Sequence, residues 1–157
     1  MKSTGVTRRP AKVLMIASAG GHWQQLMLLR DAVEGQDAQY ATTLPGLAEQ
    51  WQIEGAHLIP DCNRNSWLAV LHSTAMIMLM LLRVRPAVIV TTGALPGFLA
   101  LVLGRKLGAK TVWIDSVANA EEMSLAGLKA KKYADLWLSQ WPNVAQASGA
   151  EFAGSVL

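Results

Sequence analysis

The sequence predicts an α/β fold with a doubly wound parallel sheet. Short apolar runs such as 87–91 (AVIVT) are rich in β-branched residues, as buried strands are. Segments with apolar residues at helical spacing alternate with these runs, and glycine-containing loops follow several of them. Strands that alternate with helices in this way form parallel sheets that helices cover on both faces.

Each element is assigned from its local pattern. In the first helix, Leu26, Leu29 and Val33 recur at helical spacing. In a later helix, Pro96 suits the first turn and Gly108 suits the end. In chain order we expect a strand at 12–17, a helix at 22–33, a strand at 38–43, a short helix at 47–54, a strand at 56–60, a helix at 67–82, a strand at 87–91, a helix at 93–107, a strand at 111–114, a helix between 124 and 133, and a strand at 136–139.

The composition fits one domain with an apolar excess. We assign 1–11 as an N-terminal tail and 12–157 as a single Rossmann-like domain. Hydrophobic residues make up 52% of the chain and charged residues 16%, which indicates a partner interface or contact with a bilayer. The net charge of +3 mildly favours anionic partners. Because Cys62 is the only cysteine, an internal disulfide and a cysteine-rich metal site are excluded.

The loop after the first strand is a candidate for binding or catalysis. It reads Ser18-Ala19-Gly20-Gly21-His22 and leads directly into a helix. Glycines allow backbone N–H groups to approach a ligand closely, and a helix N-terminus attracts phosphate or a developing oxyanion. His22 suits a general base or, when protonated, a phosphate contact. The alternative is an ordinary glycine turn with a capping histidine.

Two further loops follow strands at the same edge of the predicted sheet. Thr92 and Gly93 precede a helix whose free N–H groups can meet an anion or sugar hydroxyls. Asp115, Ser116 and Asn119 place a carboxylate, a hydroxyl and an amide on one loop, a set suited to hydrogen bonding a sugar. Since ligands of such sheets bind outside the carboxyl ends of the strands, we predict that both loops bind the substrate. The alternatives are an ordinary strand-to-helix turn and an aspartate that caps or forms a salt bridge.

The helix at 67–82 is unusually apolar, and 76–82 carries apolar residues on every side. A surface helix would show a polar stripe, and a bilayer span takes about 20 apolar residues. We therefore predict that the helix lies in or against a membrane; the alternative is a central buried helix. The residues expected to contact the membrane are Trp67, Leu71, Met76, Met78, Leu79 and Leu82.

Several function classes lack their signature in this sequence. Neither a Walker A loop, nor a G-x-G-x-x-G fingerprint, nor a nucleophile elbow is present. No motif requires a metal or another cofactor, so we expect none. Lys129, Lys131 and Lys132 indicate a solvated helix face, and without a recognisable module around them we expect no nucleic-acid binding.

Taken in order, the loop motifs resemble those of a known family. The segments that carry the resemblance are 18–22 (SAGGH), 92–94 (TGA), 115–116 (DS), 124–127 (SLAG), 134–136 (ADL), 140–142 (QWP) and 152–155 (FAGS). Together they resemble the PssD-type exopolysaccharide proteins of bacteria and their eukaryotic relative, the membrane-anchoring subunit of the dolichol-pathway N-acetylglucosaminyltransferase (the Alg14-like family). The resemblance covers nearly the whole chain.

The resemblance implies a fold like the N-terminal, acceptor-binding half of MurG-like GT-B glycosyltransferases. It also implies that the sugar-nucleotide half is a second polypeptide, and the chain length is consistent with this expectation. The loop at 20–22 would then face the cleft between the subunits, near a lipid-linked acceptor. The residues expected at the partner interface are Gln140, Phe152, Gly154 and Leu157.

From the resemblance we expect a membrane-associated, acceptor-binding domain that works with a donor-binding glycosyltransferase subunit. The pair would transfer a hexosyl, hexuronosyl or N-acetylhexosaminyl unit from a UDP-sugar to a polyprenyl- or dolichyl-diphosphate-linked saccharide at the cytoplasmic membrane face. His22 would be the base or a phosphate contact. One alternative is a non-catalytic membrane scaffold for a transferase with a complete active site of its own. Another is a self-sufficient small α/β enzyme, flavodoxin-like or a hydrolase.

Overall fold

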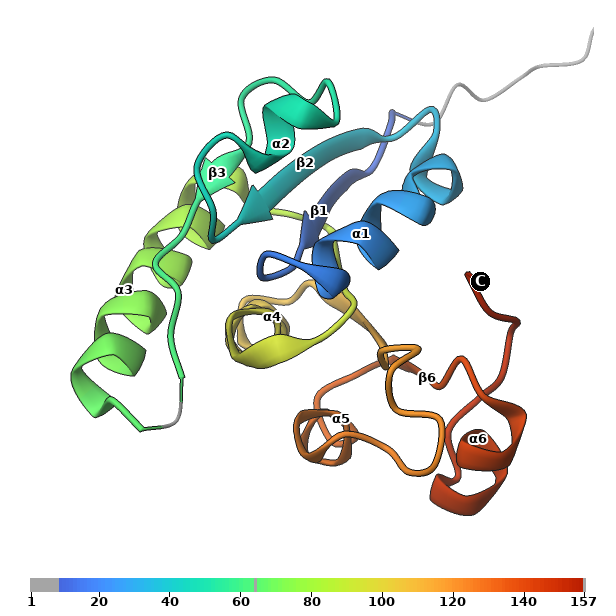
Figure 1. Cartoon of the computed structure of the whole chain (residues 1–157). Helices are drawn as coiled ribbons and strands as arrows, with labels where there is room; N and C mark the ends of the chain where they lie inside the picture. Colours follow the sequence, from blue (N-terminus) through green and yellow to red (C-terminus); the bar gives the residue numbers. More distant parts are fainter. Residues whose placement is uncertain (1–8, 64, 157) are drawn as a thin grey trace, which may run out of the picture.

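Six parallel strands form one sheet in a computed structural model that describes residues 9–63 and 65–156 (Figure 1). Their order across the sheet is β3-β2-β1-β4-β5-β6. The strands are β1 (Lys12–Ile16), β2 (Asp37–Thr42), β3 (His57–Leu58), β4 (Val88–Thr91), β5 (Lys110–Ile114) and β6 (Leu136–Leu138). The helices are α1 (Gly21–Leu28), the 3-10 helix η1 (Arg30–Val33), α2 (Leu47–Gln50), α3 (Trp67–Val84), α4 (Ala94–Lys106), α5 (Leu125–Ala130) and α6 (Pro142–Ser148). The predicted doubly wound parallel sheet is confirmed.

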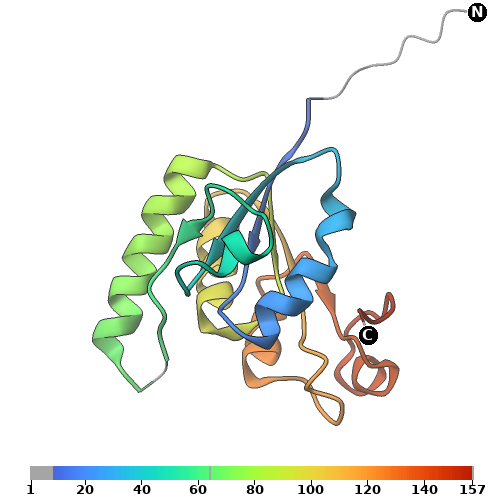
Figure 2. The same cartoon turned by 45° about the horizontal axis from the view of Figure 1, so that its top comes forward.

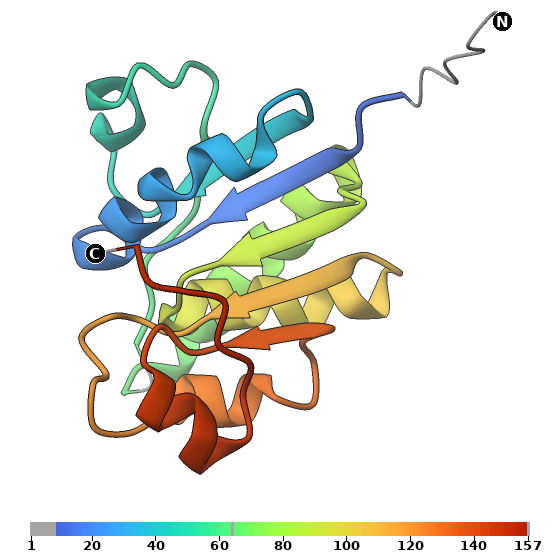
Figure 3. The same cartoon turned by 90° about the vertical axis from the view of Figure 1, so that its right-hand side faces the viewer.

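The strand order reverses at β1, which pairs with β2 on one side and with β4 on the other. In an open parallel sheet, such a reversal separates the loops that follow the two neighbouring strands and leaves a crevice for ligands. Figure 3 shows β1 and β4 side by side with their carboxyl ends at the same edge. The loops after β1 and β4 therefore define the first place to look for a site.

Helices cover both faces of the sheet (Figure 2). On one face, α3 and α4 pack against Leu14 and Ile16 of β1 and Ile89 of β4. On the other face, α1 and α2 pack against Val13 and Met15 of β1. Successive residues of β1 from Val13 to Ile16 thus point to opposite faces and are all buried, which explains why this strand reads as a continuous apolar run.

A third apolar cluster holds α5 and α6 against β5 and β6. Trp113 of β5 and Trp137 of β6 lie in it together with Val144 of α6. Both of these indoles also have a polar partner, because Trp137 Nε1 donates to Gly127 O at 2.8 Å and Trp113 Nε1 donates to Asp115 Oδ1 at 3.1 Å. Burying the rings with their N–H groups satisfied stabilises the end of the sheet that carries the later loops.

Two predicted helices are shorter than expected. The helix expected at 22–33 divides into α1 and η1, because the Leu29 N–H donates to Leu26 O, which tightens the chain into 3-10 geometry. The helix expected at 47–54 is only α2, and Gln52 shortly after it has a φ of 59°, which is left-handed and cannot continue a helix.

The remaining differences lie at the edges of the sheet. The strand expected at 56–60 is reduced to β3, which pairs with β2 over two residues. The helix α6 was not predicted, although Pro142 at its start is a typical first-turn residue. The other expected elements are present with shifts of their boundaries.

Candidate functional site

His22 and Thr92 hydrogen bond to each other at the point where the strand order reverses. His22 lies in the first turn of α1, and Thr92 follows β4. His22 Nδ1 is 2.9 Å from Thr92 O, and Thr92 Oγ1 donates to His22 O at 2.6 Å. Because a carbonyl oxygen can only accept, Nδ1 carries the proton in this pair. In the neutral tautomer that this bond selects, the lone pair lies on Nε2, the atom that a general base needs.

Two glycines shape the backbone around this pair. Gly20 and Gly93 are the N-caps of α1 and α4, with φ of 80° and 126° and extended negative ψ, a region that glycine alone adopts readily. A Cβ on Gly93 would lie 2.8 Å from His22 Cε1, so the imidazole can pack here only because the side chain is absent. The prediction placed Gly93 near a ligand; the structure adds that it makes room for His22. Ala94, with a φ of 62°, adds backbone strain beside it.

The loop after β1 completes this part of the site. Ala19 N–H donates to Thr43 Oγ1 at 3.0 Å, which ties the loop to the end of β2. The first-turn N–H groups of α1 and α4 have no partner within their own helices and lie at the same sheet edge. The predicted residues that the structure brings together here are Ser18, Gly20, Gly21, His22, Thr92 and Gly93. Within the described residues, no cluster of His, Cys, Asp and Glu is arranged to hold a metal.

Asp115 organises the loop after β5. It is 2% exposed, and its carboxylate accepts from Trp113 Nε1, Asn119 Nδ2 at 3.0 Å and both the N–H and the hydroxyl of Ser124. Asp115 and Asn119 therefore hydrogen bond to each other, with Asp115 buried and Asn119 half-buried, although both were predicted to contact the acceptor. In this geometry they fix the shape of the loop, and a direct acceptor contact by either stays a prediction.

A buried amide network, which sequence reasoning missed, joins α1 to the later loops. Gln25 Nε2 donates to Ser116 Oγ at 3.0 Å, and Gln25 Oε1 accepts from Val117 N–H and from Gln140 Nε2, each at 3.0 Å. Gln140 also donates to Asp115 O. Gln25 lies three residues after His22 on the same helix, and a polar residue on the inward face of a short apolar helix was the available signal.

We expect Gln25→Leu to destabilise the fold by about 1–3 kcal/mol, because Ser116, Val117 N–H and Gln140 would lose buried partners. Urea unfolding monitored by tryptophan fluorescence measures the change. Gln24→Leu is the matched control, since Gln24 is the exposed neighbour on the same helix. Equal stability of the two variants would show that the network contributes nothing to the fold.

The C-terminal segment runs back over the carboxyl ends of the strands toward α1 (Figure 3). Glu151 lies beside Leu138 as an extra bridge at the edge of β6, and Val156 N–H donates to Gln140 Oε1 at 3.1 Å. Of the residues predicted at the partner interface, Phe152 and Gly154 are exposed, Gln140 is buried beneath the segment, and Leu157 lies outside the described residues.

The helix α3 has one buried side and one exposed apolar side. Residues such as Ser73, Ile77 and Leu81 are buried, yet only 28% of the helix lies inside the fold, so it is not the central buried helix of the alternative prediction. By length and composition alone it could cross a membrane. Met78, expected at the membrane, is half-buried. We define the α3 apolar face by its exposed large side chains, Trp67, Leu68, Leu71, Met76, Leu79 and Leu82.

Comparison with known families gives one match. The family model described as "Oligosaccharide biosynthesis protein Alg14 like" matches residues 30–156. The matched range includes Thr92, the loops after β4, β5 and β6, and the α3 apolar face, while His22 precedes it. No curated protein matches the sequence significantly.

Solved structures with similar folds include sugar-nucleotide enzymes. MurG from Acinetobacter baumannii is 14% identical with a TM-score of 0.66 over 86% of this chain and 43% of its own. UDP-N-acetylglucosamine 2-epimerase from Rickettsia bellii is 11% identical with a TM-score of 0.72 over 94% of this chain and 46% of its own. A glycosyltransferase from Rickettsia africae is 12% identical with a TM-score of 0.61 over 92% and 41%. The chain spans less than half of each protein, and the likeness confirms the predicted fold, that of the N-terminal half of a GT-B glycosyltransferase.

Proposed function

Because this chain belongs to the Alg14-like family of oligosaccharide biosynthesis proteins, we propose that it is the membrane-associated, acceptor-binding subunit of a two-protein glycosyltransferase. Its partner is a separate subunit that binds the UDP-sugar. The acceptor is a saccharide carried on polyprenyl or dolichyl diphosphate at the cytoplasmic face of a membrane. A PssD-type role in exopolysaccharide synthesis is the specific form that the loop motifs favour.

The observation that carries the proposal is the His22–Thr92 pair, because the tautomer that this bond selects has its lone pair on Nε2, beside two helix N-termini. Nε2 takes the proton of the acceptor hydroxyl while its oxygen bonds to the anomeric carbon of the donor sugar. The bond from that carbon to the UDP oxygen breaks, and UDP leaves with the electron pair. Backbone N–H groups at Gly20 and Gly21 offer favourable contacts to the diphosphate of the lipid, whereas the Gly93 N–H already donates to Thr91 Oγ1 at 3.2 Å and Gly93 only shapes the site.

Two surfaces support the other parts of the proposal. The α3 apolar face suits insertion among lipid headgroups and acyl chains, because a water-exposed helix face of this size is normally polar. Phe152 and Gly154 are exposed on the C-terminal segment, which lies over the strand ends next to the site. A donor subunit that binds this segment closes the cleft over the acceptor.

Reconstitution with a donor-binding glycosyltransferase subunit tests the proposal. We expect transfer from a UDP-sugar to a polyprenyl-diphosphate-linked saccharide only when both chains are present, measured by the mobility shift of a fluorescent acceptor. Full activity of the donor subunit alone on a short-chain, detergent-soluble acceptor would make this chain a scaffold. Activity of this chain alone would make it a self-sufficient enzyme.

A further inference from the structure

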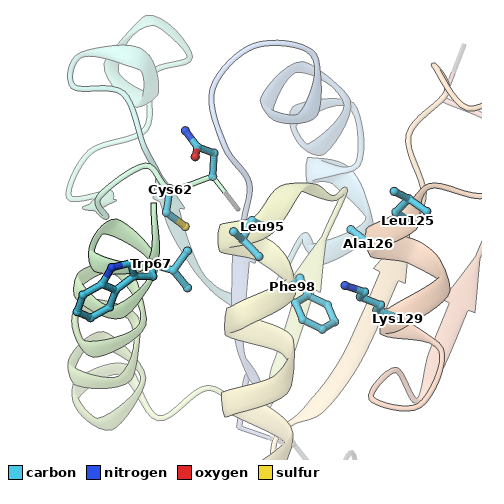
Figure 4. Close-up of a pocket in the computed structure, with 9 residues that line it drawn as sticks. Cys62, Trp67, Leu95, Phe98, Leu125, Ala126 and Lys129 are labelled. Carbon is cyan, nitrogen blue, oxygen red and sulfur yellow. The ribbon is translucent and has the colours of Figure 1, made fainter. Parts of the chain in front are cut away.

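An apolar groove of about 620 Å³ lies where α3, α4 and α5 begin (Figure 4). These three helix ends stand at the same edge of the sheet as the loops of the candidate site, because α4 follows β4 and α5 follows the loop after β5. The lining residues are Cys62, Asn63, Trp67, Val70, Leu95, Phe98, Leu125, Ala126 and Lys129.

The groove connects the α3 apolar face to the site. Trp67 belongs both to that face and to the wall of the groove. Leu95 on the opposite wall comes two residues after Gly93, the glycine that contacts the His22 ring. A mostly apolar groove therefore runs from the α3 apolar face to the first turn of α4, which follows the Gly93 loop.

One cation stands beside this path. Lys129 is the only charged residue among the described groove residues, and it pairs with no carboxylate in the part of the chain that the structure describes. Figure 4 shows its side chain extending from α5 toward Phe98 on α4. An apolar channel with an unpaired ammonium group at its wall complements a single hydrocarbon chain that ends in phosphate.

We propose that this groove binds the first isoprene units of a polyprenyl phosphate lipid, with Lys129 beside its phosphate. The choice of a prenyl lipid rests on the proposed function. The exposed Leu125, at 62%, is then covered by the chain instead of by water. The groove gives the acceptor a second point of attachment, so its saccharide is held at a fixed distance from His22.

The sole cysteine of the protein reports occupancy, because Cys62 lines the groove. Burial raises the pKa of its thiol, so all alkylation rates are compared at one pH. Farnesyl phosphate at about ten times its Kd should slow alkylation of Cys62 by N-ethylmaleimide about tenfold. Inorganic phosphate should give no protection. Dihexanoyl phosphatidic acid should also give none, and equal protection by it would overturn the prenyl assignment in favour of a phospholipid site.

Matched variants locate the binding. Leu125→Glu places a carboxylate in the groove and should abolish protection by farnesyl phosphate, whereas Leu128→Glu, a similarly exposed change on the same helix outside the groove, should keep it. Lys129→Gln should lower protection to the level that farnesol gives. Isothermal titration calorimetry with the same ligands and variants provides a second measurement. Unchanged binding in Leu125→Glu, or no binding to wild-type protein, would overturn the inference.

The alkylation and calorimetry measurements need no donor subunit. Their outcome is therefore independent of the sugar-transfer assay that tests the proposed function. If Leu125→Glu and wild-type protein transfer sugar equally with the donor subunit while farnesyl phosphate gives no protection, the groove assignment is wrong and the proposed function stands. If farnesyl phosphate protects Cys62 but no donor subunit supports transfer, the groove assignment stands and the proposed function is wrong.

Discussion

With the donor subunit, a UDP-sugar and a lipid-linked acceptor present, the His22→Gln variant should transfer sugar about 10²–10⁴ times more slowly than the wild-type protein. Glutamine approximates the shape of the side chain, but its amide has no basic lone pair. The hydroxyl of the acceptor then keeps its proton as it attacks, which raises the barrier of the chemical step. Steady-state kinetics at saturating donor measure the loss.

The kinetic parameter that changes distinguishes the two roles assigned to His22. A general base lowers kcat when it is removed and leaves KM for the acceptor nearly unchanged, whereas a phosphate contact chiefly raises KM. Gln24→Ala is the control for the integrity of α1, since Gln24 is exposed on the same turn. Wild-type kcat and KM in His22→Gln would remove this residue from the reaction altogether.

The second large effect should come from the α3 apolar face. The double variant Leu71→Glu/Leu79→Glu should bind vesicles of anionic phospholipid at least about a hundredfold more weakly than wild-type protein. Burial of each leucine side chain in the membrane contributes about 1.5–3 kcal/mol to binding, which the glutamate variant loses. Each factor of ten in affinity corresponds to about 1.4 kcal/mol. Co-flotation with vesicles on a density gradient measures the binding. The fold should be unaffected, because both leucines are exposed.

A charge-matched control separates membrane contact from a general loss of apolar surface. Leu28→Glu/Leu128→Glu also replaces two exposed leucines, one of them on α1 at the opposite face of the sheet, and should float like the wild-type protein. The α3 variant should still transfer sugar to a detergent-soluble acceptor with the donor subunit. Flotation of the α3 variant at the wild-type level would show that another surface binds the membrane.

Local sequence patterns were sufficient for the fold class and for most of its elements. The β-branched run at 87–91 and the glycine loops after two strands identified β4, β1 and the helices that follow them. What the patterns could not contain is the strand order, because the pairing of β1 with β4 depends on contacts across 70 or more positions. The family resemblance implied only the type of fold, that of the N-terminal half of a GT-B glycosyltransferase, and the strand order comes from the structure.

The site was predictable in position but only partly in role. Placing His22 and Thr92 at the same edge of the sheet required only the alternation of elements. The requirement for glycine at position 93 could not be predicted, because it arises from the contact between Gly93 and the His22 ring, which leaves no room for a Cβ. The burial of Asp115 could not be predicted either, because its hydrogen bonds with Ser124 form only when the loop after β5 folds back on itself.

The buried amide pair also determines when the site can form. Gln25 and Gln140 are 115 positions apart, so a growing chain exposes α1 to water long before the partner of its buried amide has been synthesised. Contacts between residues so far apart in sequence form late in folding, because the long intervening segment must be ordered first. The β1–α1 loop with His22 therefore acquires its final support only when Gln140 has left the ribosome. A nascent chain should engage its acceptor only after synthesis of α6 and the segment that follows it.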